Sequence, residues 1–111
     1  WGNTINCSLA RYDECGGQKS TDPVGSFKAN AFGLYDMHGN VWEFVQDCFY
    51  YYYDEGAPNR GEAWEKGSCI HRVLRSGSWG RDPADLRSAN RNYTDRSYRT
   101  PVTGFRLAQD I

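Results

Sequence analysis

Residues 36–43, with the sequence Asp-Met-His-Gly-Asn-Val-Trp-Glu, come closest to a metal site in residue type and spacing. Asp36 and Glu43 bracket a tight turn that the Gly39-Asn40 pair predicts. Turn carbonyl groups and two carboxylates together supply the mixed oxygen ligands that hard cations such as calcium take. The spacing does not match an EF-hand loop, and an ordinary capped turn explains the same residues without a metal.

The cysteines form an even set of four without a Cys-X-X-Cys spacing, which argues against a tetrahedral zinc site. They are Cys7, Cys15, Cys48 and Cys69. In an oxidising compartment two disulfides are expected, and Cys7–Cys15 with Cys48–Cys69 is the local choice among three pairings. Four buried thiols are the alternative. The cysteines favour a periplasmic or secreted protein over a cytoplasmic one.

Arginines gather in the last third of the chain, with acidic residues between them. Pairing with those carboxylates, or stacking on Tyr and Trp rings, would make them structural. Binding of an anion or a carboxylate substrate is the functional alternative. The two histidines, His38 and His71, lie in different segments, and Ser78 has no evident His and Asp partners, so no catalytic triad is predicted.

Length and charge narrow the possible classes. A chain of 111 residues predicts one domain, and a formal net charge of −1 gives no support to nucleic-acid binding. No apolar run approaches the ~20 residues of a membrane helix, so no membrane partner is expected. The chain starts at Trp1, and we therefore expect a processed protein or a fragment.

Short strands and long loops must position these residues. Twelve glycines and 15% aromatic residues favour a loop-rich fold. Strands are predicted at 41–47, 72–75, 86–90 and 104–107, and a turn or two of helix at most in 57–66. The five aromatic residues at 49–53 predict a surface strip or a recognition surface. A Cys48–Cys69 bridge would clamp the following loop, residues 54–68.

Longer blocks then point to a family. They are Val-Gly-Ser-Phe at 24–27, Asn-Ala-Phe-Gly-Leu-Tyr-Asp-Met-His-Gly-Asn-Val-Trp-Glu-Phe-Val at 30–45, Arg-Val-Leu-Arg-Ser-Gly-Ser-Trp at 72–79, Leu-Arg-Ser-Ala-Asn-Arg at 86–91 and Gly-Phe-Arg-Leu at 104–107. In this order they strongly resemble the formylglycine-generating enzyme, or sulfatase-modifying factor, family. The resemblance implies an α+β, C-type-lectin-like fold with short strands and little helix. Residues 1–111 are expected to be the C-terminal part of one such domain, without its N-terminal part.

The resemblance also implies a set of site residues. Its calcium pattern falls on Asp36, Gly39, Val41 and Glu43. The best-known members oxidise a sulfatase cysteine to formylglycine with copper and oxygen, using two cysteines shortly after the Gly-Ser-aromatic block. No cysteine follows Cys69 here, and Cu(I) needs soft thiolate ligands, so copper is not expected. The pocket predicted to take a protein, a peptide or a small anionic ligand consists of Ser78, Trp79, Arg81, Arg87 and Arg91.

Several functions follow from this resemblance. The first is a calcium-binding member without the copper site, with a divergent or accessory activity. The alternative is a ligand-binding module like the variable proteins diversified by retroelements, because residues 80–103 are rich in Asn, Tyr, Asp, Ser, Thr and Arg. The missing thiols argue against a true formylglycine-generating oxidase. A sulfoxide-synthase-like iron enzyme would need ligands from a domain outside this chain.

Overall fold

The fold is built on one small sheet with long loops at both ends. The computed structural model describes residues 2–53 and 56–109. Its strands are β1 (Trp42–Cys48), β2 (His71–Arg75), β3 (Asn92–Asp95) and β4 (Thr103–Gly104), in the order β3-β2-β1-β4. Two short 3₁₀ helices, η1 (Asp13–Cys15) and η2 (Pro83–Leu86), are the only helices in these two ranges. Neither is long and apolar enough to cross a membrane.

Strands β1 and β2 form the centre of the sheet. They pair antiparallel, with Glu43 opposite Arg75 and Phe44 opposite Leu74. The register shifts between Phe44 and Cys48, a bulge that bends β1. Strand β3 pairs antiparallel with β2, and the two-residue β4 runs parallel to the start of β1.

The predicted strands at 41–47 and 72–75 are confirmed, each shifted or extended by one residue. The strand predicted at 86–90 is wrong. Leu86 instead ends η2, which begins where Pro83 fixes a helical φ and the Asp82 side chain accepts a hydrogen bond from the Ala84 amide at 3.0 Å. Residues 87–90 form a turn, in which the Asn90 amide donates to the Arg87 carbonyl at 2.9 Å. Of the strand predicted at 104–107, only Gly104 lies in a strand, as the second residue of β4.

Two further elements differ from the prediction. Residues 57–66 contain no helical turn. Strand β3 was not predicted, because its sequence Asn-Tyr-Thr-Asp has no apolar alternation. It is an edge strand, and the backbone groups on its inner side pair with β2, so the neighbouring strand creates it.

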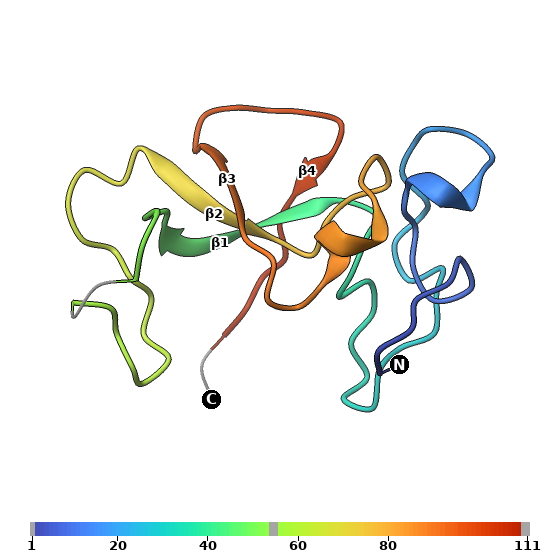
Figure 1. Cartoon of the computed structure of the whole chain (residues 1–111), viewed down its shortest axis with the longest axis horizontal. Helices are drawn as coiled ribbons and strands as arrows, with labels where there is room; N and C mark the ends of the chain where they lie inside the picture. The colour runs from blue at the N-terminus through green and yellow to red at the C-terminus, as the bar shows by residue number, and fades with distance from the viewer. Residues whose placement is uncertain (1, 54–55, 110–111) are drawn as a thin grey trace.

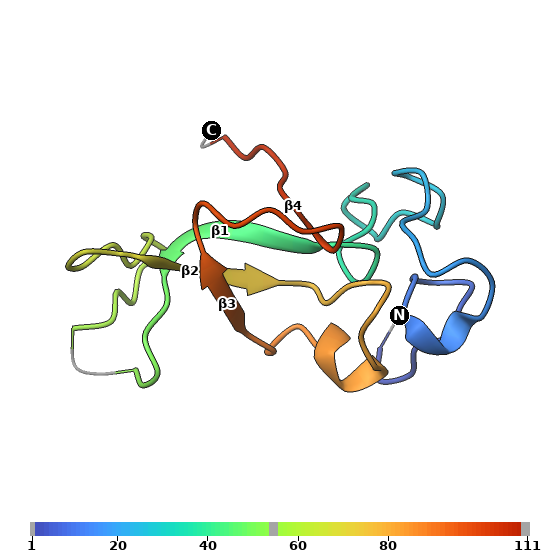
Figure 2. The ribbon, with the colours of Figure 1, turned by 90° about the horizontal axis from the view of Figure 1, so that it is seen from above.

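The two loop regions lie at opposite ends of the sheet (Figures 1 and 2). Residues 2–40 lie at one end together with η2, and a small core of Ala10, Tyr12 and Leu86 joins them. Residues 49–53 and 56–69 lie at the other end. The ends of the sheet therefore present two different surfaces.

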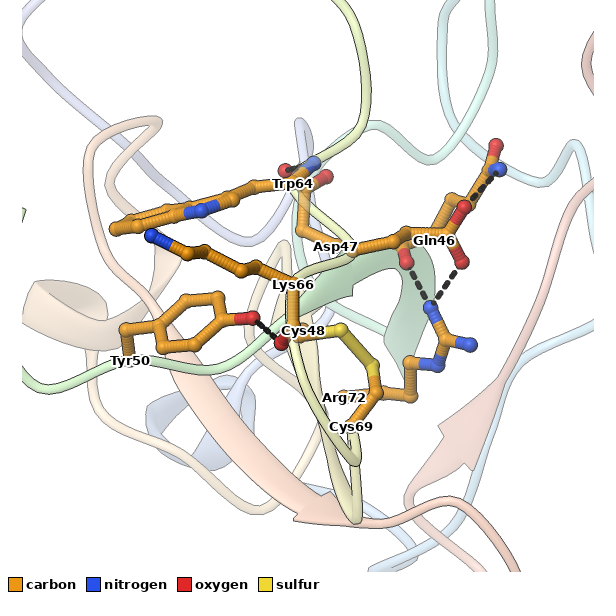
Figure 3. The surroundings of a disulfide bond; sticks show 9 residues. Gln46, Asp47, Cys48, Tyr50, Trp64, Lys66, Cys69 and Arg72 are labelled. Carbon is orange, nitrogen blue, oxygen red and sulfur yellow. Dashed lines mark hydrogen bonds and ion pairs between the residues drawn. A yellow bond between two sulfur atoms is a disulfide. The ribbon is translucent and has the colours of Figure 1, made fainter. Parts of the chain in front are cut away.

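Both local disulfides predicted from the sequence are confirmed. Cys7 pairs with Cys15 beside η1, and Cys48 at the end of β1 pairs with Cys69 just before β2. Figure 3 shows the second bridge with Tyr50, Trp64 and Arg72 around it. It closes the 49–68 loop at its base, and the Cys48 amide also donates to the Trp64 carbonyl at 2.8 Å.

Candidate functional site

Buried polar atoms without partners mark the places where a ligand could bind. In residues 2–53 and 56–109, four buried side-chain nitrogen or oxygen atoms have no hydrogen-bond partner. They are Arg11 Nε, Asp36 Oδ1, Trp64 Nε1 and Ser78 Oγ. Because leaving such a group unpaired costs about 1–3 kcal/mol, each needs an explanation. Arg11 Nε has the Asp22 carboxylate 3.7 Å away, and the other three lie at three separate sites.

The first site is the acidic turn at 36–43. Asp36 adopts a left-handed backbone with φ of 51°, and its Oδ2 accepts a hydrogen bond from the Gly25 amide at 2.6 Å. Its Oδ1 is the buried oxygen without a partner. Val41 uses its carbonyl to accept from the Ser76 hydroxyl at 2.9 Å. The turn therefore offers one unused carboxylate oxygen.

Arg106 reaches this turn from the C-terminal segment. Its Nε donates to Glu43 Oε2 at 2.6 Å, and a second guanidinium nitrogen bonds Glu43 Oε1. The same guanidinium donates to the carbonyls of Tyr35 at 3.0 Å and Asp36 at 2.9 Å. The hydrogen bonds that Arg106 donates to Glu43 raise the pKa of Arg106, so it stays charged.

These residues fit a calcium ion as oxygen ligands. Asp36 Oδ1 is unpaired and buried, and each Glu43 oxygen has a second lone pair beyond the one that Arg106 uses. No cluster of three or more His, Cys, Asp or Glu able to hold a metal occurs in the described ranges, so backbone carbonyls would complete the ligand set. The predicted ligands Gly39 and Val41 lie on the same turn, between the two carboxylates.

The second site is a cavity of about 320 Å³ at Ser78, after β2. Ser78 is only 1% exposed, and its unpartnered Oγ belongs to a residue that lines this cavity. Arg81 also lines it and forms an ion pair with Asp85 at 3.3 Å. The remaining lining residues are uncharged: Trp42, Leu74, Gly80, Asn92, Thr94, Tyr98, Thr100, Val102 and Thr103.

The five predicted pocket residues do not line one cavity. Ser78 and Arg81 share the cavity just described. Trp79 lines none of the three cavities that the other four residues line, and its Nε1 donates to the Pro101 carbonyl at 3.3 Å. Arg87 lines another cavity, of about 510 Å³, near Leu86. Arg91 lines a third, of about 80 Å³. Sequence proximity grouped side chains that the fold separates.

Sequence reasoning missed most of the lining of the Ser78 cavity. Thr94, Tyr98 and Thr100 fall within the polar stretch 80–103, which was singled out by composition alone. That composition was the available signal. The buried wall residues Trp42 and Leu74 come from β1 and β2 and gave no separate signal.

This arrangement of short strands, turn-rich blocks and a Gly-Ser-Trp segment with buried Gly77 and Ser78 defines a known class of domain. The chain belongs to the sulfatase-modifying factor enzyme 1-like domain family, whose sequence model matches residues 1–111. The family resemblance predicted from the motif blocks is confirmed, and structural neighbours with the same loop-rich architecture confirm the fold.

Individual relatives show how broadly this segment is shared. The chain is 37% identical over 92 residues to the serine/threonine-protein kinase pkn1 of Chlamydia caviae, covering 82% of this chain and 15% of the kinase. It is 34% identical over 109 residues to the formylglycine-generating enzyme of Mycobacterium tuberculosis, covering 90% of this chain and 36% of the enzyme. The chain therefore spans well under half the length of these relatives.

Two solved structures give the same picture. PvdO from Pseudomonas aeruginosa superimposes with a TM-score of 0.81 at 43% identity, over 94% of this chain and 40% of PvdO. Treponema denticola variable protein 1 gives a TM-score of 0.68 at 28% identity, over 88% of this chain and 34% of that protein.

Proposed function

We propose that this chain is an accessory, ligand-binding member of the family that does not carry out copper-dependent cysteine oxidation. Calcium holds its 36–43 turn, and the cavity at Ser78 takes the ligand. The observation that carries the proposal is the use of the cysteines. Both disulfides together consume all four, and residues 2–53 and 56–109 contain no free cysteine.

Copper chemistry needs thiolates at the site. A disulfide sulfur carries no negative charge and cannot serve as the soft thiolate ligand of Cu(I). No cysteine occurs in the sequence after Cys69, so Ser78 and Trp79 are followed by Gly80, Arg81 and Asp82 instead. These side chains supply hydrogen bonds and charge, which suits binding rather than copper ligation.

The relatives support an accessory role. The shared segment makes up 15% of a protein named as a kinase and 36% of one named as a formylglycine-generating enzyme. A segment found in proteins of such different chemistry is not tied to one reaction. Ligand binding at a preformed cavity is a property that both could use.

Calcium would be held by Asp36, the Gly39 and Val41 carbonyls, and Glu43. When bound, it supplies a divalent charge that neutralises the two carboxylates and fixes the turn. Arg106 already compensates part of this negative charge and holds part of the turn, because it donates hydrogen bonds to Glu43 and to the carbonyls of residues 35 and 36. Fixing the turn also fixes Asn40. The Asn40 carbonyl accepts a hydrogen bond from the Trp79 amide at 2.8 Å, beside the Ser78 cavity.

A thermal melt with calcium and with chelator tests the metal. We expect calcium to raise the melting temperature of the wild type, and Asp36→Asn and Glu43→Gln to lose that rise. Glu43→Gln also weakens the hydrogen bond with Arg106 and lowers the melting temperature by itself. The readout is therefore the difference in melting temperature between calcium and chelator for each variant. Glu62→Gln, an exposed carboxylate elsewhere, is the control and should keep the full response. An undiminished calcium response in Asp36→Asn would rule out this ligand set.

The absence of copper chemistry is tested separately. The chain is incubated with copper, oxygen and a Cys-X-Pro-X-Arg peptide, and the peptide mass is followed. We expect the cysteine to remain unchanged. Formation of formylglycine would overturn the thiolate argument.

A second candidate is a binding module with a diversified surface. The specific observation is the similarity to Treponema denticola variable protein 1 together with the cavity lining from the polar stretch 80–103. This candidate predicts a nearby, nearly identical repeat of the coding sequence that differs mainly at adenines in codons 80–103. Genome sequences around the gene decide it, and the absence of such a repeat would exclude this version.

A further inference from the structure

A small cavity lies on the other face of the sheet from Ser78. Val45 and Asp47 of β1 and Val73 and Arg75 of β2 line it, and its volume is about 80 Å³. Side chains alternate between the two faces of a strand, so Val73 and Arg75 of β2 face away from Leu74, which lines the Ser78 cavity. The two cavities share no lining residue.

The 49–69 segment covers this face. Trp64 is 6% exposed, and its ring lies against those of Tyr50 at 4.1 Å and Tyr53 at 6.0 Å between centroids. The Trp64 amide donates to Asp47 Oδ1 at 3.1 Å, and the disulfide anchors the segment at its base. Trp64 and Tyr53 are therefore walls of a formed cavity.

Hydrogen-bond donors outnumber acceptors here. The indole Nε1 of Trp64 can only donate, and it is buried without an acceptor. Arg91 donates to the Tyr50 carbonyl at 3.0 Å, and its guanidinium lies 5.1 Å above the Phe49 ring and 4.5 Å above the Tyr53 ring. These cation–π contacts and the hydrogen bond hold the guanidinium at the cavity.

Arg75 supplies a second guanidinium. It donates to the Ser88 carbonyl, and each guanidinium carries five N–H groups, so donors remain beyond these bonds. Asp47 is the one carboxylate among the cavity's lining residues, and its Oδ1 already accepts from the Trp64 amide. Two cations against one anion leave the cavity with an excess positive charge.

We propose that this cavity is a subsite for a carboxylate, the acidic side chain of a protein or peptide partner. A carboxylate supplies the acceptor that Trp64 Nε1 lacks and pairs with the planar Arg91 guanidinium. The volume of about 80 Å³ compares with about 30 Å³ per water molecule in the liquid, so it holds a carboxylate on a short methylene stem. Val45 and Val73 give the stem an apolar floor.

The surroundings suit a protein partner. Tyr53 lines the cavity and is 68% exposed, and its neighbours Tyr51 and Tyr52 are 74% and 85% exposed. Tyrosines combine large contact area with a polar tip and are typical of recognition surfaces around a charged anchor. The subsite is separate from the Ser78 cavity and does not depend on the function proposed there.

The test is a titration of the ¹⁵N-labelled chain, followed by the indole N–H signals in NMR spectra. Propionate is the probe, propionamide is its uncharged counterpart, and chloride keeps the ionic strength constant. Trp64→Phe assigns the signal. We expect a saturable shift of the Trp64 signal with propionate only. A peptide carrying one glutamate should produce the same shift at lower concentration than propionate, whereas a peptide with glutamine should not.

Variants locate the binding groups. Arg91→Gln and Arg75→Gln should each weaken propionate binding about tenfold, as expected for loss of one charge-assisted contact of ~1.4 kcal/mol. Arg99→Gln, an exposed arginine outside the three cavities, should bind like the wild type. Arg75→Gln leaves the contacts of Arg91 with the aromatic rings in place, so it still tests the loss of one positive charge if Arg91→Gln disturbs the loop.

No saturable shift, an equal shift with propionamide, or unchanged binding in Arg75→Gln would each overturn the proposal. If propionate binds but the glutamate peptide does not, the occupant is a small free carboxylate and the partner is excluded.

Discussion

The two ends of this molecule are held together in different ways. At one end, the turn at 36–43 is fixed by backbone hydrogen bonds to distant segments. Gly39 donates its amide to the Ser76 carbonyl at 2.7 Å, and Asn40 donates to the Arg11 carbonyl at 2.9 Å. At the other end, the 49–69 segment is fixed by a disulfide and by stacked aromatic side chains. The acidic turn is thus held by backbone hydrogen bonds and by the Arg106 side chain, whereas the 49–69 segment is held by a disulfide at its base and by stacked rings.

This difference matters for function. Close backbone packing against Arg11 leaves no room for a side chain at Gly39, so the acidic turn has one fixed backbone path. The aromatic segment exposes its tyrosines while Trp64 and the bridge hold it in place. Substitutions at Tyr51 and Tyr52, which do not line the cavity, can therefore change this surface without removing a cavity wall.

The largest difference between the two ends is expected when a methyl group is added to one glycine at each end. Gly39 has φ of +76°, and a Cβ there would lie 2.3 Å from the Arg11 carbonyl oxygen. Gly39→Ala should cost about 4 kcal/mol or more of unfolding free energy, because backbone on both sides must move. Gly67 has a similar φ of +78° but nothing within 4 Å of such a Cβ, so Gly67→Ala should cost only about 1 kcal/mol. Urea denaturation measures both, and equal losses would refute the contrast.

The second-largest loss of stability is expected from truncating a core side chain at the first end. Leu86 is 1% exposed and packs with Ala10 and Tyr12. Leu86→Ala should destabilise by about 2–5 kcal/mol, because a cavity remains where the side chain was. Tyr52→Ala, at an 85% exposed position of the aromatic segment, should be within about 0.5 kcal/mol of the wild type. A loss in Tyr52→Ala comparable to that in Leu86→Ala would show that the segment is packed more tightly than its exposure indicates.

Removing the bridge at the second end should have a smaller, more local effect. The Cys48→Ser/Cys69→Ser double variant should lose about 2–4 kcal/mol and become sensitive to protease within 49–68. Reductant should do the same to the wild type. Cys7→Ser/Cys15→Ser is the control and should leave cleavage in 49–68 unchanged. Equal cleavage of the wild type with and without reductant would contradict the clamp.

The smallest effect is electrostatic. Hydrogen bonds from Arg72 at 2.8 Å and Gln46 at 2.9 Å lower the pKa of Glu65. A carboxyl group with a lowered folded pKa stabilises the fold above its unfolded pKa, and this contribution is lost as the pH falls through the folded pKa. Glu65→Gln and Arg72→Gln should each make unfolding slightly less dependent on pH in the acidic range. Denaturation midpoints measured at several acidic pH values check this, and a steeper dependence in either variant would contradict it.

The sequence by itself determined the local features and the family. Strand β1 follows from residue alternation and β2 from a short apolar pair between charged residues, and the two disulfides join cysteines that are close in the chain. The Asp36 to Glu43 turn was recognisable because its residues are contiguous. These features depend on neighbours in sequence, so residue order is enough to predict them.

Only the tertiary structure decided which side chains meet. It brought Arg106 to Glu43, 63 residues away, and it separated Arg87 and Arg91 from Ser78 into different cavities. It also formed β3, whose polar sequence becomes a strand by pairing with β2. The physical reason is that long side chains and polar strands have several possible partners of similar energy. The choice among them is made by the loops and sheet faces that pack around them, and local sequence does not encode it.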